Sequence, residues 1–180
     1  KEDIVAALAK RGGNHHPIWD MVIADGDPQL IRKLLLAEGE NSNQNQKALL
    51  ETLRRKKGLS GLGDAPFKVA LNLGYSAAKI EEILNEIPPS ELPQVAEGLN
   101  GALKDLPGLL SVLQQIGKKA PELRKKFVWK YKSLGSAGHA ELAKLFHEGT
   151  SEDKQAVIKL GEQPRLTDSW YVELLNTASH

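Results

Sequence analysis

Residues 65–75 read APFKVALNLGY, and this stretch decides how the rest of the chain is interpreted. Pro66 opens a helix, because the first helical position needs no backbone N–H donor. Ala70 is small enough to pack inside, and Gly74 supplies the backbone freedom that ends a helix in a tight turn. The stretch therefore predicts a short helix followed by a turn.

The same helical spacing of apolar residues recurs along the whole chain. It comes in segments of about ten residues closed by Gly, Pro or Asn, whereas the alternation typical of strands is scarce. Only 5% of the residues are aromatic, and Ala and Leu are abundant, which favours helices. We therefore predict an all-α protein. The expected helices are residues 3–10, 18–24, 29–36, 45–56, 66–73, 77–85, 92–103, 106–116, 121–133, 140–146, 152–159 and 168–176.

Short helices joined by short loops cannot each bury an apolar face alone, so neighbouring antiparallel pairs are expected to stack as a solenoid. Internal similarity supports such a repeat. Residues 3–14 read DIVAALAKRGGN and residues 29–43 read QLIRKLLLAEGENSN, each with an aliphatic pair, a later Leu, then Gly and Asn. Residues 138–145, GHAELAKL, have the outline of a turn and a second helix.

These stretches resemble ankyrin repeats. Residues 65–75 resemble the first-helix phrase T-P-L-H-L-A-A-x-x-G-H, and residues 3–14 resemble the second-helix phrase E-I-V-x-x-L-L-x-x-G-A-N. The resemblance implies that Gly74 and Gly138 both occupy turns between antiparallel helices. Gly26 and Gly74 are 48 residues apart and Gly74 and Gly138 are 64 apart, so only the second interval is near twice the repeat length of about 33. Another α-solenoid or a helical bundle is the alternative.

We expect a single degenerate ankyrin-like domain over residues 1–180. It would comprise a partial repeat, an insertion before the second full unit, and two capping helices, the first with Ser151 as its N-cap. The expected boundaries are 1–14 for the partial repeat, 15–43, 65–90, 92–120 and 121–150 for the units, 44–64 for the insertion and 151–180 for the caps.

Composition excludes several classes of protein. The absence of cysteine excludes disulfides and thiolate metal sites and fits a reducing, cytoplasmic setting. No apolar stretch approaches the roughly 20 residues of a membrane span, so no membrane association is expected. A net charge of +1 predicts no global attraction to nucleic acid. The chain starts without methionine, and we expect it to derive from a larger protein.

No catalytic, cofactor or metal site is predicted. His15 and His16 are adjacent, but neither belongs to an H-E-x-x-H pair. The ankyrin resemblance implies that His139 lies in a turn and makes structural hydrogen bonds there. This role explains the histidine without a metal site. The glycine-rich residues 58–63 follow a basic helix end and lack the strand and the Lys-Ser/Thr pair of a phosphate-binding loop, so they are interpreted as a flexible connection.

Residues 118–132 are the most basic part of the chain, and Phe127, Trp129 and Tyr131 are interleaved with the cations. Phe127 and Tyr131 are four residues apart, which places both on one helix face, and we expect them to face the core. The basic side is then a solvated surface, a site for an acidic protein, or an RNA contact made by phosphate pairing and base stacking.

The ankyrin resemblance implies a protein-protein interaction module that binds a folded partner on its concave face, with Trp19 and Tyr75 as anchors. One alternative is the substrate-recruiting region of a bacterial secreted effector of the ADP-ribosyl-transfer type, acting in the host cytosol. The other is a helical RNA-binding domain that uses residues 118–132. The candidate partner contacts are Trp19, Asp20, Lys68, Asn72, Tyr75, Trp129 and Lys130.

Overall fold

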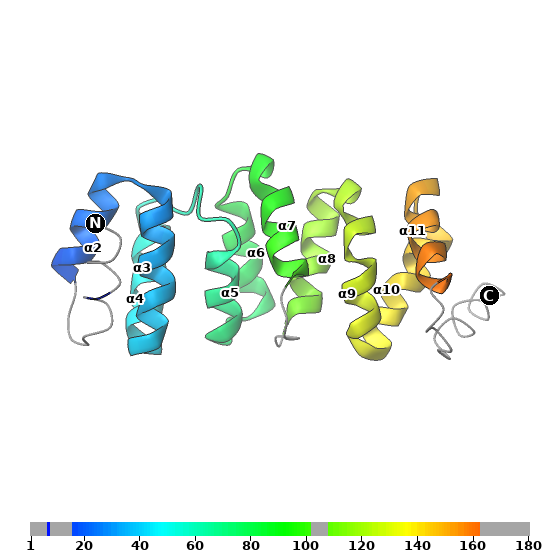
Figure 1. Ribbon diagram of the computed structural model, residues 1–180, viewed down its shortest axis with the longest axis horizontal. Helices are drawn as coiled ribbons and strands as arrows, with labels where there is room; N and C mark the ends of the chain where they lie inside the picture. Colours follow the sequence, from blue (N-terminus) through cyan, green and yellow to red (C-terminus); the bar gives the residue numbers. More distant parts are fainter. Residues whose placement is uncertain (1–6, 8–15, 102–107, 163–180) are drawn as a thin grey trace. The chain divides into compact units, whose positions relative to one another are not determined.

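The computed structural model describes Ala7, residues 16–101 and residues 108–162. All regular structure in this part of the chain is helical (Figure 1), which confirms the predicted all-α class. The chain divides into two compact units, residues 1–99 (unit 1) and 100–180 (unit 2). The helices expected at 3–10 and 168–176, and the side chains of His15, His16, Trp170, Tyr171 and His180, lie outside what the structure describes.

Unit 1 is a succession of short helices (Figure 1). Its final helix ends at Asn100, one residue beyond the unit. They are α2 (His16–Asp25), α3 (Pro28–Asn41), α4 (Asn43–Arg55), α5 (Ala65–Asn72), α6 (Ala77–Asn85), the 3-10 turn η1 (Pro89–Glu91) and α7 (Leu92–Asn100).

The helix boundaries in unit 1 follow from capping residues. Asp27 precedes α3 and its carboxylate accepts a hydrogen bond from the Gln29 N–H at 3.0 Å, while Pro28 fills the first helical position. Ser42 alone joins α3 to α4, because its N–H donates to the Glu38 carbonyl and its hydroxyl accepts from the Asn45 N–H. A one-residue connection makes α3 and α4 a tight helix pair.

The core of unit 1 forms where α3 and α4 pack against each other and both pack against α5. Helix α2 packs on α3, and α6 packs on α5. The side chains at the centre are fully buried, which removes their apolar surface from water and stabilises the unit. These are Leu35, Leu49, Leu50, Leu53 and Phe67.

Unit 2 consists of the helices that follow Gly108. Within it, η2 packs against α8, and α10 packs against both α9 and α11. Its buried centre includes Leu113, Ile116, Phe127, Leu142 and Val157. The elements are α8 (Leu109–Lys119), the 3-10 segment η2 (Pro121–Phe127), α9 (Val128–Ser133), α10 (Gly135–Glu148) and α11 (Ser151–Gly161).

The turn predicted at Gly74 is present. Gly74 follows α5 with a φ of +73°, and the Tyr75 N–H donates to the Ala70 carbonyl at 2.9 Å, which closes the end of the helix. The predicted range 77–85 matches α6 without change.

Other boundary predictions were wrong. Helix α3 continues past Leu36 to Asn41 and contains Gly39, whereas the sequence pattern ended it earlier. The segment expected as one helix over 121–133 is a 3-10 segment followed by α9. Helix α11 is capped by Thr150 rather than Ser151, because Thr150 and Asp153 form a reciprocal capping box.

The turn predicted at Gly138 is absent, because Gly138 is the fourth residue of α10 and is buried. Its position is explained by packing. A Cβ built on Gly138 would collide with the backbone carbonyl of Tyr131 and crowd the side chain of Leu134. Glycine is therefore placed here so that the start of α10 can approach the end of α9 closely.

No helix in the described part of the chain is long and apolar enough to cross a membrane.

Substituting Gly138→Ala should destabilise unit 2, because the added methyl group meets a backbone atom that cannot rotate away. We expect the free energy of unfolding to fall by about 1–3 kcal/mol, the usual range for overpacking. Urea denaturation followed by circular dichroism measures this. Ser136→Ala, on the exposed side of the same helix, is the control and should change stability by less than about 0.5 kcal/mol. Equal stability of the two variants would contradict the packing account.

Candidate interaction surface

The seven partner contacts expected from the sequence are divided between the two units. Trp19, Asp20, Lys68, Asn72 and Tyr75 belong to unit 1. The remaining two, Trp129 and Lys130, belong to α9 in unit 2.

Trp19, which we expected as an exposed anchor, is buried with 1% of its surface accessible. Its indole Nε1 donates a hydrogen bond of 2.8 Å to Oε1 of Glu38, which is itself fully buried on α3. The other Glu38 oxygen, Oε2, has no hydrogen-bond partner in the structure. A buried carboxylate is costly unless it is bonded, so the indole donor both fills the core and stabilises Glu38. Trp19 thus joins α2 to α3, and its ring is not accessible to a partner.

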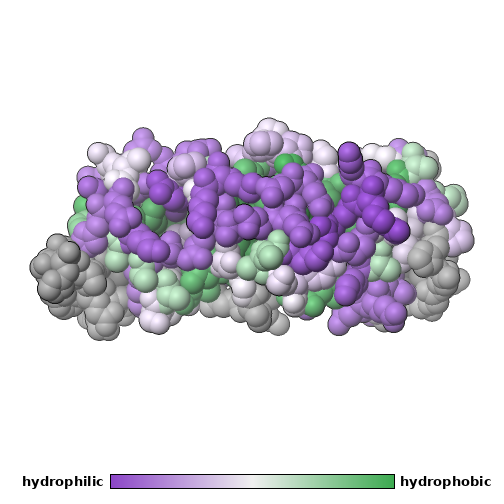
Figure 2. Space-filling view, turned by 180° about the vertical axis from the view of Figure 1, so that it is seen from behind, coloured by the Kyte–Doolittle hydropathy of each residue, from purple (hydrophilic) through white to green (hydrophobic). Residues whose placement is uncertain are grey.

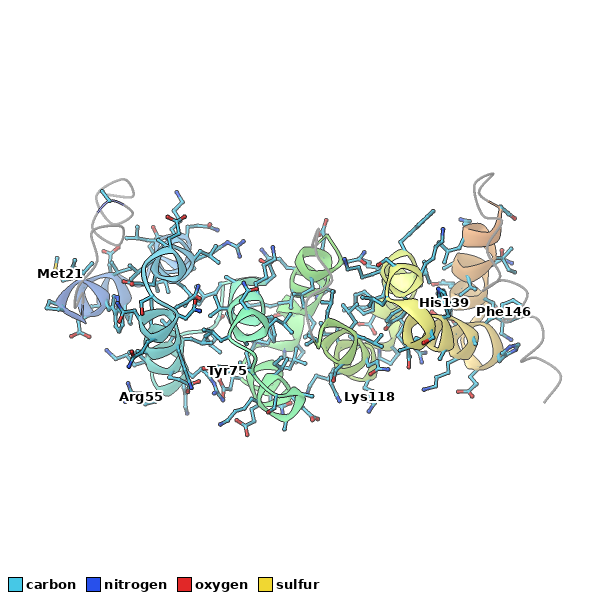
Figure 3. All side chains as sticks on the ribbon, turned by 90° about the horizontal axis from the view of Figure 1, so that it is seen from below. Met21, Arg55, Tyr75, Lys118, His139 and Phe146 are labelled. Atoms are coloured by element: carbon cyan, nitrogen blue, oxygen red, sulfur yellow. The ribbon has the colours of Figure 1, made fainter. Side chains whose placement is uncertain are left out.

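Tyr75 is half-buried and held by its own unit. Its hydroxyl donates to Oε1 of Glu51 at 2.8 Å, and the ammonium group of Lys47 lies 6.0 Å from the ring centroid. Burial and the hydrogen bond to Glu51 both raise the pKa of the Tyr75 phenol. Figure 3 shows the labelled side chain close to α4. Tyr75 therefore has a structural role in unit 1. A partner that contacts its side chain would share it with Glu51 and Lys47.

Glu51 belongs to an ion-pair cluster that joins α4 to α6. Arg54 pairs with Glu51 at 3.1 Å, Glu82 at 3.2 Å and Glu86 at 2.8 Å. Burial raises the pKa of Glu51, but hydrogen bonds from Tyr75 and Arg54 outweigh it and leave the pKa below its ordinary value. The cluster satisfies its own charges and leaves no obvious site for a ligand.

The other expected contacts in unit 1 are mostly exposed. Asp20 pairs with Lys56 at 3.5 Å, and Asn72 lies at the exposed end of α5. Lys68 is partly exposed and pairs with Asp64 at 2.8 Å. The Asp20–Lys56 pair is exposed and contributes little energy, so Asp20 and Asn72 suit the rim of an interface rather than its centre, whereas Lys68 is held by the buried Asp64.

A buried carboxylate that the sequence analysis missed organises the rest of unit 1. Asp64 accepts from Arg32 at 2.7 Å and pairs with Lys68, and Arg32 also donates to the Leu62 carbonyl at 3.0 Å. Burial raises the pKa of Asp64, but hydrogen bonds from Lys68 and Arg32 outweigh it, so the pKa lies below its ordinary value. A Cβ on Gly98 of α7 would lie 2.5 Å from the Asp64 carboxyl group.

A surface cleft of about 400 Å³ lies beside this carboxylate. Its walls are mostly polar, whereas small-molecule sites are mostly apolar. Arg32 and Asp64 are paired with each other, and the other charged residue of the lining is Glu97, whose side chain is exposed. The lining residues are Gln29, Arg32, Gly61, Leu62, Gly63, Asp64, Gln94, Glu97 and Gly98.

In unit 2, two of the aromatic residues in the basic segment face the core, as predicted. Phe127 is 0% and Tyr131 2% exposed, and their rings meet edge to face with centroids 6.0 Å apart. Burial raises the pKa of the Tyr131 phenol, and the nearby charge of Glu141 raises it further. Lys130, which we expected to contact a partner, is also buried, with 8% of its surface exposed. These side chains hold α9 in place.

Trp129 is the exception, with 52% of its surface exposed. The ammonium group of Lys132 lies 5.9 Å from the centroid of the indole ring, a cation–π contact that fixes both side chains on one face. Lys126, three residues before Trp129, is exposed as well. Lys126, Trp129 and Lys132 are called the Trp129 strip below.

The backbone beneath the Trp129 strip is well anchored. The Lys126 carbonyl accepts a hydrogen bond of 2.8 Å from Nδ2 of Asn100, and Nε2 of His139 lies 3.1 Å from the Lys132 carbonyl. The hydroxyl of Ser133 donates to the Lys130 carbonyl. A binding surface on such a fixed helix loses little conformational freedom when a partner docks.

The face of the molecule drawn in Figure 2 is largely hydrophilic, and its hydrophobic residues form small, separate patches. The large apolar side chains that are exposed in the described residues are Met21, Leu36 and Trp129. Of these residue types only tryptophan is enriched among residues that dominate binding energy. Trp129 is therefore the strongest candidate contact.

Within the described part of the chain, no three His, Cys, Asp or Glu side chains come together as metal ligands would. The sequence matches no protein-family model, and neither curated proteins nor solved structures gave a significant match.

The lowered pKa of Asp64 predicts how stability depends on pH. The carboxylate stabilises the folded state above about pH 4, the ordinary range of aspartate, and this contribution is lost as pH falls through the lowered folded pKa. Asp64→Asn should therefore cost about 1–2 kcal/mol at pH 7, a modest value because Arg32 and Lys68 keep contact with solvent. The difference from the unsubstituted protein should shrink below about pH 3.

Urea denaturation at both pH values tests this, with Glu97→Gln from the same cleft as the control. A penalty for Asp64→Asn that is as large at low pH as at pH 7 would show that the carboxylate charge is not what stabilises the unit.

Proposed function

We propose that the chain is a protein-binding module and that Trp129 is the centre of its contact surface. The observation that carries this proposal is a half-exposed tryptophan on the firmly held helix α9, with the exposed Lys126 and the half-buried Lys132 beside it. A tryptophan side chain supplies a large contact area at a low cost in conformational entropy, and burying it in a partner is strongly favourable.

The packing around α9 supports this role. Helix α9 contacts α10, η2 and α11, so the side chains that point inward are fixed on several sides. Phe127 and Tyr131 supply that inward packing, which leaves Trp129 as the aromatic side chain of the segment that faces solvent. The arrangement separates a structural face from a contact face.

The same observation favours protein over RNA as the partner. Proteins that bind single-stranded RNA stack successive bases on several aromatic rings. In residues 118–132 two of the three aromatic rings are buried, so one ring remains for stacking. A single exposed tryptophan in a basic setting is instead typical of a protein-protein hot spot with a charged rim.

Removing the indole should weaken partner binding while the fold is kept. The partner can be captured by photo-crosslinking from an extract of the source cells and its affinity then measured by titration calorimetry. Trp129→Ala should cost about 2 kcal/mol or more, roughly a 30-fold loss of affinity, because it removes the main buried contact of the interface.

Met21→Ala is the matched control, since Met21 is 73% exposed on α2 in unit 1 and its loss should leave affinity unchanged. Circular dichroism should show both variants folded. A folded Trp129→Ala variant that binds the captured partner with undiminished affinity would exclude Trp129 as the contact.

A further inference from the structure

The charges around Trp129 show which partner chemistry suits the Trp129 strip. Residues 118–132 contain seven cations and a single acid, Glu122. Arg124 pairs with Asp153 at 3.5 Å, and Lys125 pairs with Glu152. These pairs attach η2 to α11.

The lysines of residues 118–132 give this segment an excess of positive charge, much of it exposed. Lys118, Lys119 and Lys126 are exposed, and Lys132 is half-buried against the indole ring. A surface with this excess of one charge attracts partners of the opposite charge and accelerates their encounter.

The spacing of the residues in the Trp129 strip determines how the matching groups of a partner must be arranged. Lys126 and Lys132 each stand three residues from Trp129, so the two cations are separated by about 9–12 Å along the chain axis, with the indole between them. A complementary surface has an apolar side chain at its centre and a carboxylate beside it.

We propose that the Trp129 strip binds an acidic segment of the partner protein, in which an apolar side chain covers the indole ring and a carboxylate beside it pairs with Lys126. This inference rests on the proposed function, and it specifies the partner. Contact with Trp129 determines how long the complex lasts, whereas the lysines mainly determine how fast it forms.

Synthetic peptides test the inference on the full chain without knowledge of the natural partner. The probes are three fluorescein-labelled 15-mers: Glu-Glu-Leu repeated five times, Glu-Glu-Ser repeated five times, and oligouridylate. Fluorescence anisotropy gives each affinity. The leucine peptide should bind at least fivefold more tightly than the serine peptide of equal charge, and more tightly than the RNA.

Substitutions then test the contributions of the indole ring and of Lys126 separately. Trp129→Ala should lower the affinity for the leucine peptide to that for the serine peptide. Lys126→Glu should slow association of both peptides severalfold at low salt, and the effect should diminish as salt screens the charges. Lys154→Glu, which makes the same charge change on an exposed position of α11, is the control and should change the rate by less than twofold.

Equal binding of the two peptides, no binding of either, or a Lys154→Glu effect equal to that of Lys126→Glu would overturn the inference. Tighter, Trp129-dependent binding of oligouridylate would replace it with an RNA site.

The affinity of the natural partner for the substituted chains distinguishes the failure of this inference from the failure of the proposed function. If that partner depends on Trp129 but is insensitive to Lys126→Glu and to salt, only the acidic-segment inference fails. If it is insensitive to Trp129→Ala, the proposed function fails.

Discussion

The buried carboxylate of Asp64 is the interaction on which unit 1 most depends. It lies in the connection between α4 and α5, yet its two cationic partners come from α3 and α5, and Gly98 of α7 approaches it closely. Burying a carboxylate is costly unless its oxygens are bonded, and Arg32 and Lys68 bond the two oxygens of Asp64. Gly98 follows from it, because a Cβ at this position would lie 2.5 Å from the Asp64 carboxyl group. Gly61 and Gly63, which precede Asp64, have positive φ, a conformation that favours glycine.

Much of the fold could be predicted from local sequence, because helix starts and stops depend on neighbouring residues. Pro66, Gly74 and Ser76 fix the ends of α5 and the start of α6, and the prediction of this pair was confirmed. Gly39 and Gly138 were misinterpreted as helix ends. Each is a helical glycine beside a residue from another segment, Gln46 for the first and Tyr131 for the second, and sequence spacing does not reveal such an approach.

The candidate surface was harder to predict, since burial is set by partners that are distant in sequence. Trp19 and Trp129 are the same residue type, but Trp19 meets Glu38 on the next helix and is buried, whereas Trp129 faces solvent beside Lys132. The basic segment did carry one usable signal. The four-residue spacing of Phe127 and Tyr131 predicted that both face inward, and it follows that Trp129, two residues from each, faces the other way. Lys130 was misassigned because it shares the inward face with them.

The central claim is that Trp129 is presented to solvent while Trp19 is part of the core. Fluorine NMR of the chain labelled with 5-fluorotryptophan tests it directly, with the three resonances assigned by Trp129→Phe and Trp170→Phe variants. The account predicts a large change in the Trp129 chemical shift when H₂O is replaced by D₂O and almost none for Trp19, because the shift change follows contact with water. A Trp19 resonance that responds to D₂O as strongly as that of Trp129, or a Trp129 resonance that does not respond, would contradict it.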